Sequence, residues 1–167
     1  MYITAEELKS VLYEYQITEI TEDDEAITDE AIAAAEAEVR SYFEAANARR
    51  ETAGLNAQQY ASWVMYDIDA VFNKTDNDRN AFLKRLIMRL AAFNLCELAQ
   101  VDVLNDRLMA MHDSTISTLE KIAGTGDYKN ARIIVSGLPT ITPAPSPGES
   151  ADKPFRMTSR KKFTHNF

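Results

Sequence analysis

Apolar side chains recur at helical spacing along most of the chain, beginning close to the N-terminus. Thr4 and Glu7 have the spacing of a capping box, in which each side chain bonds the other residue's backbone. Ile3 and Leu8 have the spacing of a hydrophobic staple. One apolar stripe follows: Leu8, Val11, Leu12 and Tyr15. The pattern predicts a helix that ends near Tyr15, followed by a polar, acidic connection, TEITEDDEAIT.

The alanine-rich segment DEAIAAAEAEVRSYFEAANARR predicts a second helix. We expect it to start near Thr28 or Asp29 and to break at Gly54. Its expected buried face comprises Ile32, Ala35 or Glu36, Val39, Tyr42 and Phe43. The small residues expected to let a neighbouring helix come close are Ala33, Ala34 and Ala37.

Residues 54–75 mix apolar and polar positions without one period, so both a short helix and a strand fit them. Three aromatic residues, Trp63, Tyr66 and Phe72, indicate that this stretch packs against the rest of the protein.

The strongest helical pattern is TDNDRNAFLKRLIMRLAAFNLCELAQ, with Asp76 or Asp78 as its expected N-cap. Its apolar face is broad, which is typical of a central core helix: Phe82, Leu83, Leu86, Ile87, Leu90, Phe93 or Asn94, and Leu98. A further helix, NDRLMAMHDSTISTLEKIAGTG, begins at Asn105 or Asp106 and ends at Gly124 and Gly126. The short turn between the two predicts an antiparallel helix pair.

The character of the sequence changes after residue 126. The β-branched run NARIIVSG predicts one short strand, and a single strand must pair with a hairpin partner or with another chain. The candidate residues for strand addition are Arg132, Ile133, Ile134 and Val135. The following segment, LPTITPAPSPGESADKP, contains all five prolines and is typical of an extended linker. The predicted fold is therefore mainly α: a helical domain over residues 1–137, and a linker and arm over 138–167.

Charge is distributed unevenly over a chain whose net charge is −8. Ten of the first thirty residues are acidic, against one basic residue, Lys9. Such an acidic body is not expected to bind nucleic acid through a general phosphate contact surface. The last fifteen residues are basic and aromatic instead. We predict that they form a partner-binding arm through Phe155, Arg156, Arg160, Lys161, Lys162, Phe163 and Phe167.

No pattern predicts catalysis, a cofactor or a metal site. His112 and His165 do not fall in a zinc-binding or di-metal helix motif, and no glycine-rich phosphate loop or nucleophile elbow is present. The acidic cluster TEDDEA lacks the alternation and glycine of a calcium loop. Cys96 is a single cysteine among apolar neighbours, so no intrachain disulfide is expected. No run is long and apolar enough to span a bilayer, and no secretory signal is expected.

Several segments together resemble the small head-to-tail connector proteins of tailed bacteriophages, in particular a Mu-like group. They are the opening MYITAEEL, the helix AIAAAEAEVRSYFEA and the helix end LEKIAGTGD. The terminal pattern of Ser159, Lys161 and Lys162 with His165, Asn166 and Phe167 is also similar.

The resemblance implies a structural virion protein without enzymatic activity. Such connectors form a ring, typically a dodecamer, that binds the portal protein and the tail or the next ring. DNA passes through the ring without sequence-specific binding, and no membrane is involved. The expected location is the head–tail interface of a virion assembled in the host cytoplasm. From composition alone, a small acidic helical regulatory or antitoxin-like binding module is the alternative.

Overall fold

The computed structural model describes residues 1–22, 24–52, 64–98, 106–125 and 132–141. This part of the protein is mainly helical, as predicted, and contains one short antiparallel sheet. The elements in chain order are α1 (Ala5–Leu8), α2 (Glu14–Thr21), α3 (Glu25–Thr52), β1 (Met65–Tyr66), α5 (Ile68–Phe72), the 3-10 helix η1 (Asp76–Asp78), α6 (Ala81–Leu98), α7 (Asp106–Ala123) and β2 (Thr140–Ile141).

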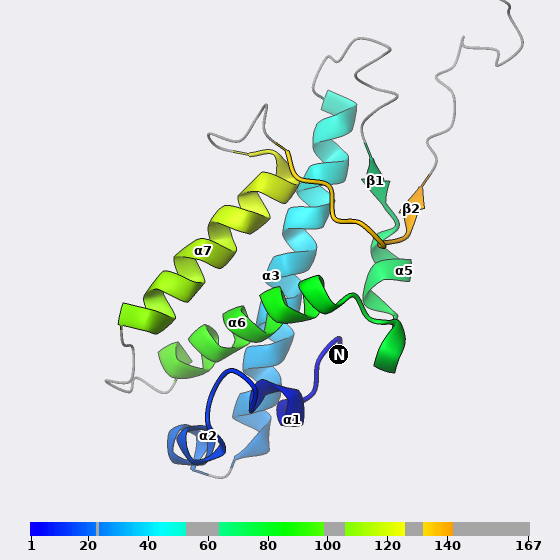
Figure 1. Cartoon of the computed structure of the whole chain (residues 1–167). Helices are drawn as coiled ribbons and strands as arrows, with labels where there is room; N and C mark the ends of the chain where they lie inside the picture. Colours follow the sequence, from blue (N-terminus) through cyan, green and yellow to red (C-terminus); the bar gives the residue numbers. More distant parts are fainter. Residues whose placement is uncertain (23, 53–63, 99–105, 126–131, 142–167) are drawn as a thin grey trace, which may run out of the picture.

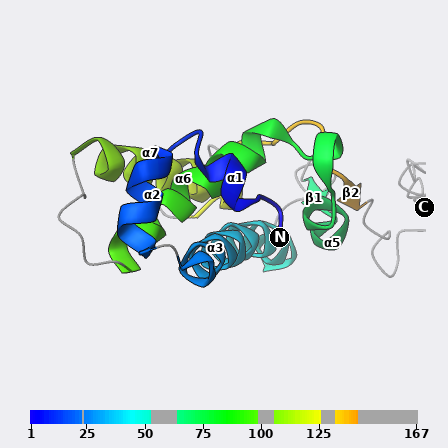
Figure 2. The same ribbon diagram turned by 90° about the horizontal axis from the view of Figure 1, so that it is seen from below.

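Three long helices form the core. The most extensive contact joins α3 to α6, and α7 packs against both. In Figure 1, α6 crosses α3 from right to left and α7 returns toward the upper right, so the chain reverses direction between them. Seen from below, α3 lies on one side of the molecule, with α1, α6 and α7 on the other (Figure 2). The predicted partner of α6 was α7, but α6 makes its larger contact with α3.

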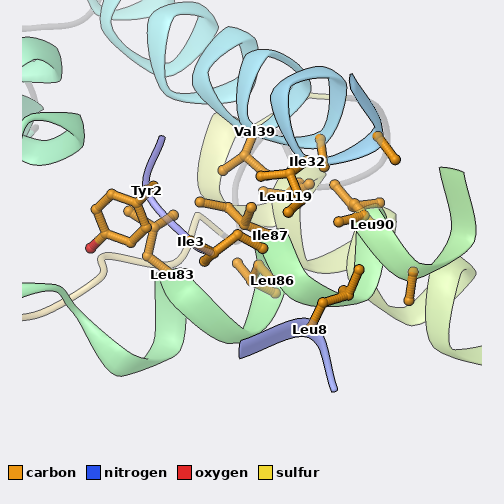
Figure 3. Packing of buried hydrophobic residues seen from close by; sticks show 14 of the residues in the cluster. Tyr2, Ile3, Leu8, Ile32, Val39, Leu83, Leu86, Ile87, Leu90 and Leu119 are labelled. Carbon is orange, nitrogen blue, oxygen red and sulfur yellow. The ribbon is translucent and has the colours of Figure 1, made fainter. Parts of the chain in front are cut away.

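The core is built by apolar side chains from all three long helices and from the N-terminal segment. Figure 3 shows the α3 residues Ile32 and Val39 pointing toward Ile87 and Leu90 of α6. The fully buried side chains of largest volume are Tyr2, Tyr66, Phe43, Ile3, Leu8, Ile32, Leu83, Leu86, Ile87, Leu90 and Leu95. The periodicity of the sequence therefore identified most of this core.

The N-terminal capping box is confirmed. Thr4 Oγ1 accepts from the Glu7 N–H at 3.4 Å, and a Glu7 carboxylate oxygen accepts from the Thr4 N–H at 3.1 Å. The staple residues Ile3 and Leu8 are both buried. The predicted extent of the helix is wrong, because α1 ends at Leu8. The side chain of Gln16 accepts a hydrogen bond from the Tyr13 N–H at 3.1 Å. A second helix, α2, begins at Glu14, just before the predicted helix end at Tyr15, and continues into the stretch predicted as a connection.

Helix α3 begins a few residues before the predicted start. Its predicted buried face is confirmed for four residues: Ile32, Ala35, Val39 and Phe43. The three alanines predicted to contact a neighbouring helix, Ala33, Ala34 and Ala37, are exposed. The buried alanines of α3 are instead Ala31, Ala35 and Ala46. In the ambiguous stretch both expected structures occur, since β1 is followed at once by α5. Trp63 lies outside the described residues.

The N-cap of α6 is Asn80 rather than Asp76 or Asp78. Its Oδ1 atom accepts from the N–H groups of Phe82 and Leu83 at 3.0 and 3.2 Å. Asp76 lies in the 3-10 helix with φ of 51°. Helix α7 ends as predicted, because Gly124 adopts φ of 68° and the carbonyl of Glu120 accepts from residues 124 and 125.

The two strands pair antiparallel, with Met65 opposite Ile141 and Tyr66 opposite Thr140. The N–H of Asp67 extends this pairing by donating to the carbonyl of Pro139 at 3.0 Å. Leu138 is buried in the core, so the packed unit continues beyond the predicted boundary at residue 137. Strand β2 falls in the stretch that the sequence predicted as linker.

Candidate interaction surfaces

The protein presents two distinct ends along α3. We call residues 64–66 and 132–141 the sheet end, which lies beside the C-terminal half of α3 (Figure 1). We call the groove between α1, α2 and the first turn of α3 the acidic groove, which lies at the other end of that helix. Each is held in place by its own polar network.

Tyr66 organises the sheet end. Its ring is fully buried and packs edge-on against Phe43, with centroids 4.9 Å apart. Its hydroxyl accepts a hydrogen bond from the Val135 N–H at 3.0 Å. The side chain of Asn47, in α3, bonds the backbone of Tyr66. It accepts from the Tyr66 N–H at 2.9 Å and donates to the Tyr66 carbonyl at 2.8 Å. The Asn47 amide therefore closes the edge of β1 that faces away from β2.

Arg132 joins the end of α7 to the sheet end. Its Nε donates to the carbonyl of Ile122 at 3.0 Å, and Nη2 donates to the carbonyl of Val64 at 3.1 Å. The guanidinium carbon lies 5.7 Å from the centroid of the Tyr66 ring. A positive charge at the C-terminus of a helix is stabilised by the partial negative charge there. Arg132 thus acts as a structural clamp, a role that its sequence neighbours do not indicate.

The four residues predicted for strand addition, 132–135, do not form a strand. The N–H of Ile133 donates to the carbonyl of Lys121 at 3.0 Å, and Val135 is buried against the fold. Anchoring of Arg132 and Val135 to α7 and Tyr66 gives the segment an irregular course. The predicted strand is therefore wrong for residues 132–135, and strand structure occurs instead a few residues later, in β2. Strand addition at residues 132–135 stays a prediction.

Apolar side chains remain exposed at the sheet end. Ile133, Ile134 and Ile141 expose 41%, 53% and 45% of their surface. Exposed isoleucines of this kind provide apolar contact area for another protein. Residues 142–167 follow directly and lie outside the described residues. The predicted arm residues Phe155, Arg156, Arg160, Lys161, Lys162, Phe163 and Phe167 therefore stay predictions.

The acidic groove has a volume of about 410 Å³. Four carboxylates line it: Glu6, Glu14, Glu25 and Asp29. Among the described residues along it, Lys9 is the one cation, and its Nζ lies 2.7 Å from carboxylate oxygens of both Glu6 and Glu14. The hydrogen bond to Glu14 raises the pKa of Lys9, and the same contact lowers the pKa of Glu14. The groove keeps an excess of negative charge.

Glu7 anchors the wall of the acidic groove to α6. Its carboxylate accepts two hydrogen bonds from Arg79, at 2.8 and 2.7 Å, and one from Lys84 at 2.6 Å. Partial burial works to raise the pKa of Glu7, but the hydrogen bonds from Arg79 and Lys84 outweigh it and lower the pKa to about 2. The capping-box signature identified Glu7 but gave no sign of this second role.

Tyr2 extends the same network to the N-terminal segment. Its N–H donates to a carboxylate oxygen of Glu36 at 2.6 Å, and its carbonyl accepts from Arg79 at 2.7 Å. Its hydroxyl accepts from the backbone N–H of Asn80 at 2.7 Å, and burial raises the pKa of that hydroxyl. The first residues are therefore bound to both α3 and the start of α6.

The side chains most often used in catalysis or metal binding have structural surroundings in the described part of the protein. Within the described ranges, no three His, Cys, Asp or Glu side chains come together to hold a metal ion. The His112 ring stacks on Phe93 with centroids 4.0 Å apart. Cys96 is buried, and burial raises the pKa of its thiol. No helix in the described part of the chain is long and apolar enough to cross a membrane.

Comparisons with known proteins give no match: no family model, no curated protein and no solved structure corresponds to this chain. The structure defines a class only, a mainly helical protein with a short two-stranded antiparallel sheet.

Proposed function

We propose that this chain is a structural protein of a tailed-bacteriophage virion, forming a ring at the portal vertex that joins the head to the tail. The proposal starts from the resemblance of the sequence to small connector proteins. Its main support is that two features of opposite charge, a basic arm and an acidic groove, are separated along the molecule. The basic arm follows the sheet end, and the acidic groove lies at the opposite end of α3.

The length of α3 sets the distance between the two ends. A helix of 28 residues is about 42 Å long at 1.5 Å per residue. A contact between an arm at one end of a copy and a groove at the other end of the next copy is heterologous. Repeated contacts of this type produce rings when the rotation closes and filaments when it does not.

The linker has the reach for such a contact. Residues 142–152 precede the basic segment and contain three prolines. Extended at about 3.1 Å per residue, they span roughly 34 Å. The arm carries Lys153, Arg156, Arg160, Lys161 and Lys162, while the groove carries Glu6, Glu14, Glu25 and Asp29. Opposite charge favours this docking and steers the two copies together.

The acidic composition also suits a channel through which DNA passes. An acidic lining repels the phosphate backbone and allows DNA to slide, whereas a basic lining would retain it. We propose a dodecameric ring that binds the portal protein on one side and the tail or the next ring on the other. It would form in the host cytoplasm and remain in the virion.

Charge reversal tests the arm contact. The chain is assembled with its cognate portal protein, and the mass of the product is measured by native mass spectrometry. Replacing Arg160, Lys161 and Lys162 by Glu should abolish ring formation without changing helix content by circular dichroism. Adding Glu25→Lys and Asp29→Lys, which make the groove basic, to the variant with the reversed arm should restore ring formation. A control with Arg107→Glu, on the exposed start of α7, should assemble normally.

Two results would contradict the proposal. One is normal ring assembly by the variant with the reversed arm, which would show that the basic residues of the arm do not contact the next copy. The other is a wild-type chain that stays at one or two copies and never joins the portal, which would favour the acidic regulatory or antitoxin-like module.

A further inference from the structure

Two threonines in the floor of the acidic groove differ in their hydrogen bonding. Thr21 of α2 and Thr28 of α3 are each only 3% exposed, and both line the groove. The Thr21 hydroxyl donates to the carbonyl of Ile17 at 2.9 Å. The Thr28 hydroxyl, in contrast, makes no hydrogen bond in the described part of the chain.

The hydroxyl of Thr28 opens into the groove. Among the described residues, every side-chain nitrogen or oxygen that is sealed from solvent has a hydrogen-bond partner. The unbonded hydroxyl of Thr28 is therefore not sealed, and the opening beside this nearly buried residue is the groove that it lines. A polar group at such a depth without a partner is unfavourable, so the position favours a ligand that supplies one.

Two carboxylates flank that hydroxyl on one face of α3. Glu25, Thr28 and Asp29 have the i, i+3, i+4 spacing that places side chains side by side on a helix. Glu25 and Asp29 are exposed at the rim of the groove, and neither forms an ion pair with another described residue. Like charges four residues apart on a helix repel each other, so a cation bound between them relieves that repulsion.

Lys9 does not supply this cation. Its Nζ is held at 2.7 Å by both Glu6 and Glu14, which belong to α1 and α2. The side of the groove formed by α3 therefore offers a cation three acceptors: two carboxylates at the rim and one hydroxyl in the floor.

A guanidinium group suits these acceptors better than an ammonium group. Guanidinium is planar and carries five N–H donors that point in several directions, whereas an ammonium is a compact and strongly hydrated point charge. Glu25 and Asp29 are four residues apart, about 6 Å along the axis at 1.5 Å per residue, so donors that point in different directions can reach both. The weakly hydrated faces of the guanidinium can also pack against Ala5 and Ile17 of the same groove.

We propose that the α3 side of the acidic groove binds the side chain of an arginine. Glu25 and Asp29 accept hydrogen bonds from its guanidinium, and the Thr28 hydroxyl accepts a further one deeper in the groove. The inference rests on the proposed function only for the source of this arginine, which in the ring is Arg156 or Arg160 of the neighbouring arm. It goes further by distinguishing arginine from lysine, which charge reversal of the arm does not do.

Titration with a small ligand tests the site apart from the ring. The host is the full chain with Arg156→Gln and Arg160→Gln, so that the arginines of its own arm do not compete. N-acetyl-arginine amide is added at constant ionic strength, and the backbone N–H signals are followed by nuclear magnetic resonance. We expect shifts centred on residues 25–29 and a Kd of about 1 mM, typical of a ligand of this size. N-acetyl-lysine amide should bind at least about 5-fold more weakly.

Substitutions in this host separate the hydroxyl of Thr28 from its bulk. Thr28→Val keeps the shape but removes the hydroxyl, and should weaken arginine binding roughly 10-fold. Thr28→Ser keeps the hydroxyl and should retain the affinity. Thr115→Val is the matched control, because Thr115 is buried in α7 and its hydroxyl already donates to the carbonyl of Met111 at 2.7 Å. Glu25→Gln with Asp29→Gln, at exposed positions, should abolish binding without changing the core.

Equal affinity for the arginine and lysine ligands overturns the proposal, as does unchanged affinity in Thr28→Val. The arginine site and the arm contact can fail separately. Arginine binding at Thr28, together with normal assembly by the reversed arm, would support the site and remove the arm as its source of arginine. No arginine binding, together with loss of assembly by the reversed arm, would support the arm contact and overturn the arginine site.

Discussion

Two polar centres tie distant parts of the chain to the helical core, one toward each end of α3. At the groove end the ionised Glu7 meets Arg79 and Lys84, and its side chain is 22% exposed. At the sheet end Tyr66 is fully buried, and its backbone bonds the side chain of Asn47. At the groove end the ions keep some water, which lowers the cost of placing charges there. At the sheet end the buried Tyr66 is bonded by the neutral groups of Asn47 and Val135, and the Arg132 guanidinium lies 5.7 Å from the centroid of its ring. Acid should therefore loosen the groove end while the sheet end holds.

The largest effect is expected at Tyr66, in the sheet end. Tyr66→Ala removes a buried ring and the acceptor of the Val135 N–H. We expect the free energy of unfolding to fall by roughly 3–5 kcal/mol, measured by urea denaturation. Tyr15→Ala is the control, since Tyr15 is 65% exposed, and should change stability by less than about 0.5 kcal/mol. A small loss for Tyr66→Ala would show that the sheet end does not contribute to the core.

Asn47→Ala should have the next largest effect. It leaves the N–H and carbonyl of Tyr66 without the amide that bonds both. We expect a loss of about 2–3 kcal/mol in the free energy of unfolding, because two partly buried backbone groups lose their partner. Asn73→Ala, at an exposed position, is the matched control. Hydrogen exchange at Tyr66 should accelerate in the first variant alone; unchanged exchange would contradict the role given to Asn47.

The smallest of these effects is expected at Glu7, and it should depend on pH. Its pKa is lowered from 4.5 to about 2, so its contribution is fully present above pH 4.5 and is lost as the pH falls toward 2. After allowance for screening by water we expect Glu7→Gln to cost roughly 1–2 kcal/mol at pH 7. The difference from wild type should vanish near pH 2.

Denaturation at a series of pH values checks this prediction. Glu19→Gln serves as the control, because Glu19 is a carboxylate at an exposed position of α2. An equal loss for Glu7→Gln at pH 7 and at pH 2 would show that its charge is unimportant.

Sequence patterns predicted correctly those features that depend on residues close together in the chain. The three long helices have strong apolar periods, and the capping box of Thr4 and Glu7 depends on four adjacent residues. The division of the N-terminal region into α1 and α2 was missed because Leu8, Val11 and Leu12 fit one continuous stripe. The N-cap of α6 was predicted at Asp76 or Asp78, but the cap is Asn80, which the sequence analysis did not consider. The Asn80 N–H donates to the hydroxyl of Tyr2, which lies 78 residues away in the sequence.

The candidate surfaces depend on contacts that no local pattern reveals. Asn47 bonds Tyr66 across 19 residues, and Arg132 bonds Val64 across 68. Strand β2 lies in a proline-rich stretch, and its partner β1 is distant in the sequence. The charge of the arm could be recognised from sequence, but the groove that complements it appears only when α1, α2 and α3 are packed together.

The central claim is that the arm of one copy binds the acidic groove of the next. Electron cryo-microscopy of the chain assembled on its portal tests it most directly. We predict a closed ring in which residues 153–167 of each copy lie in the groove beside Glu25 and Asp29 of its neighbour. A ring whose grooves are empty, or a portal that recruits no ring, would contradict the claim.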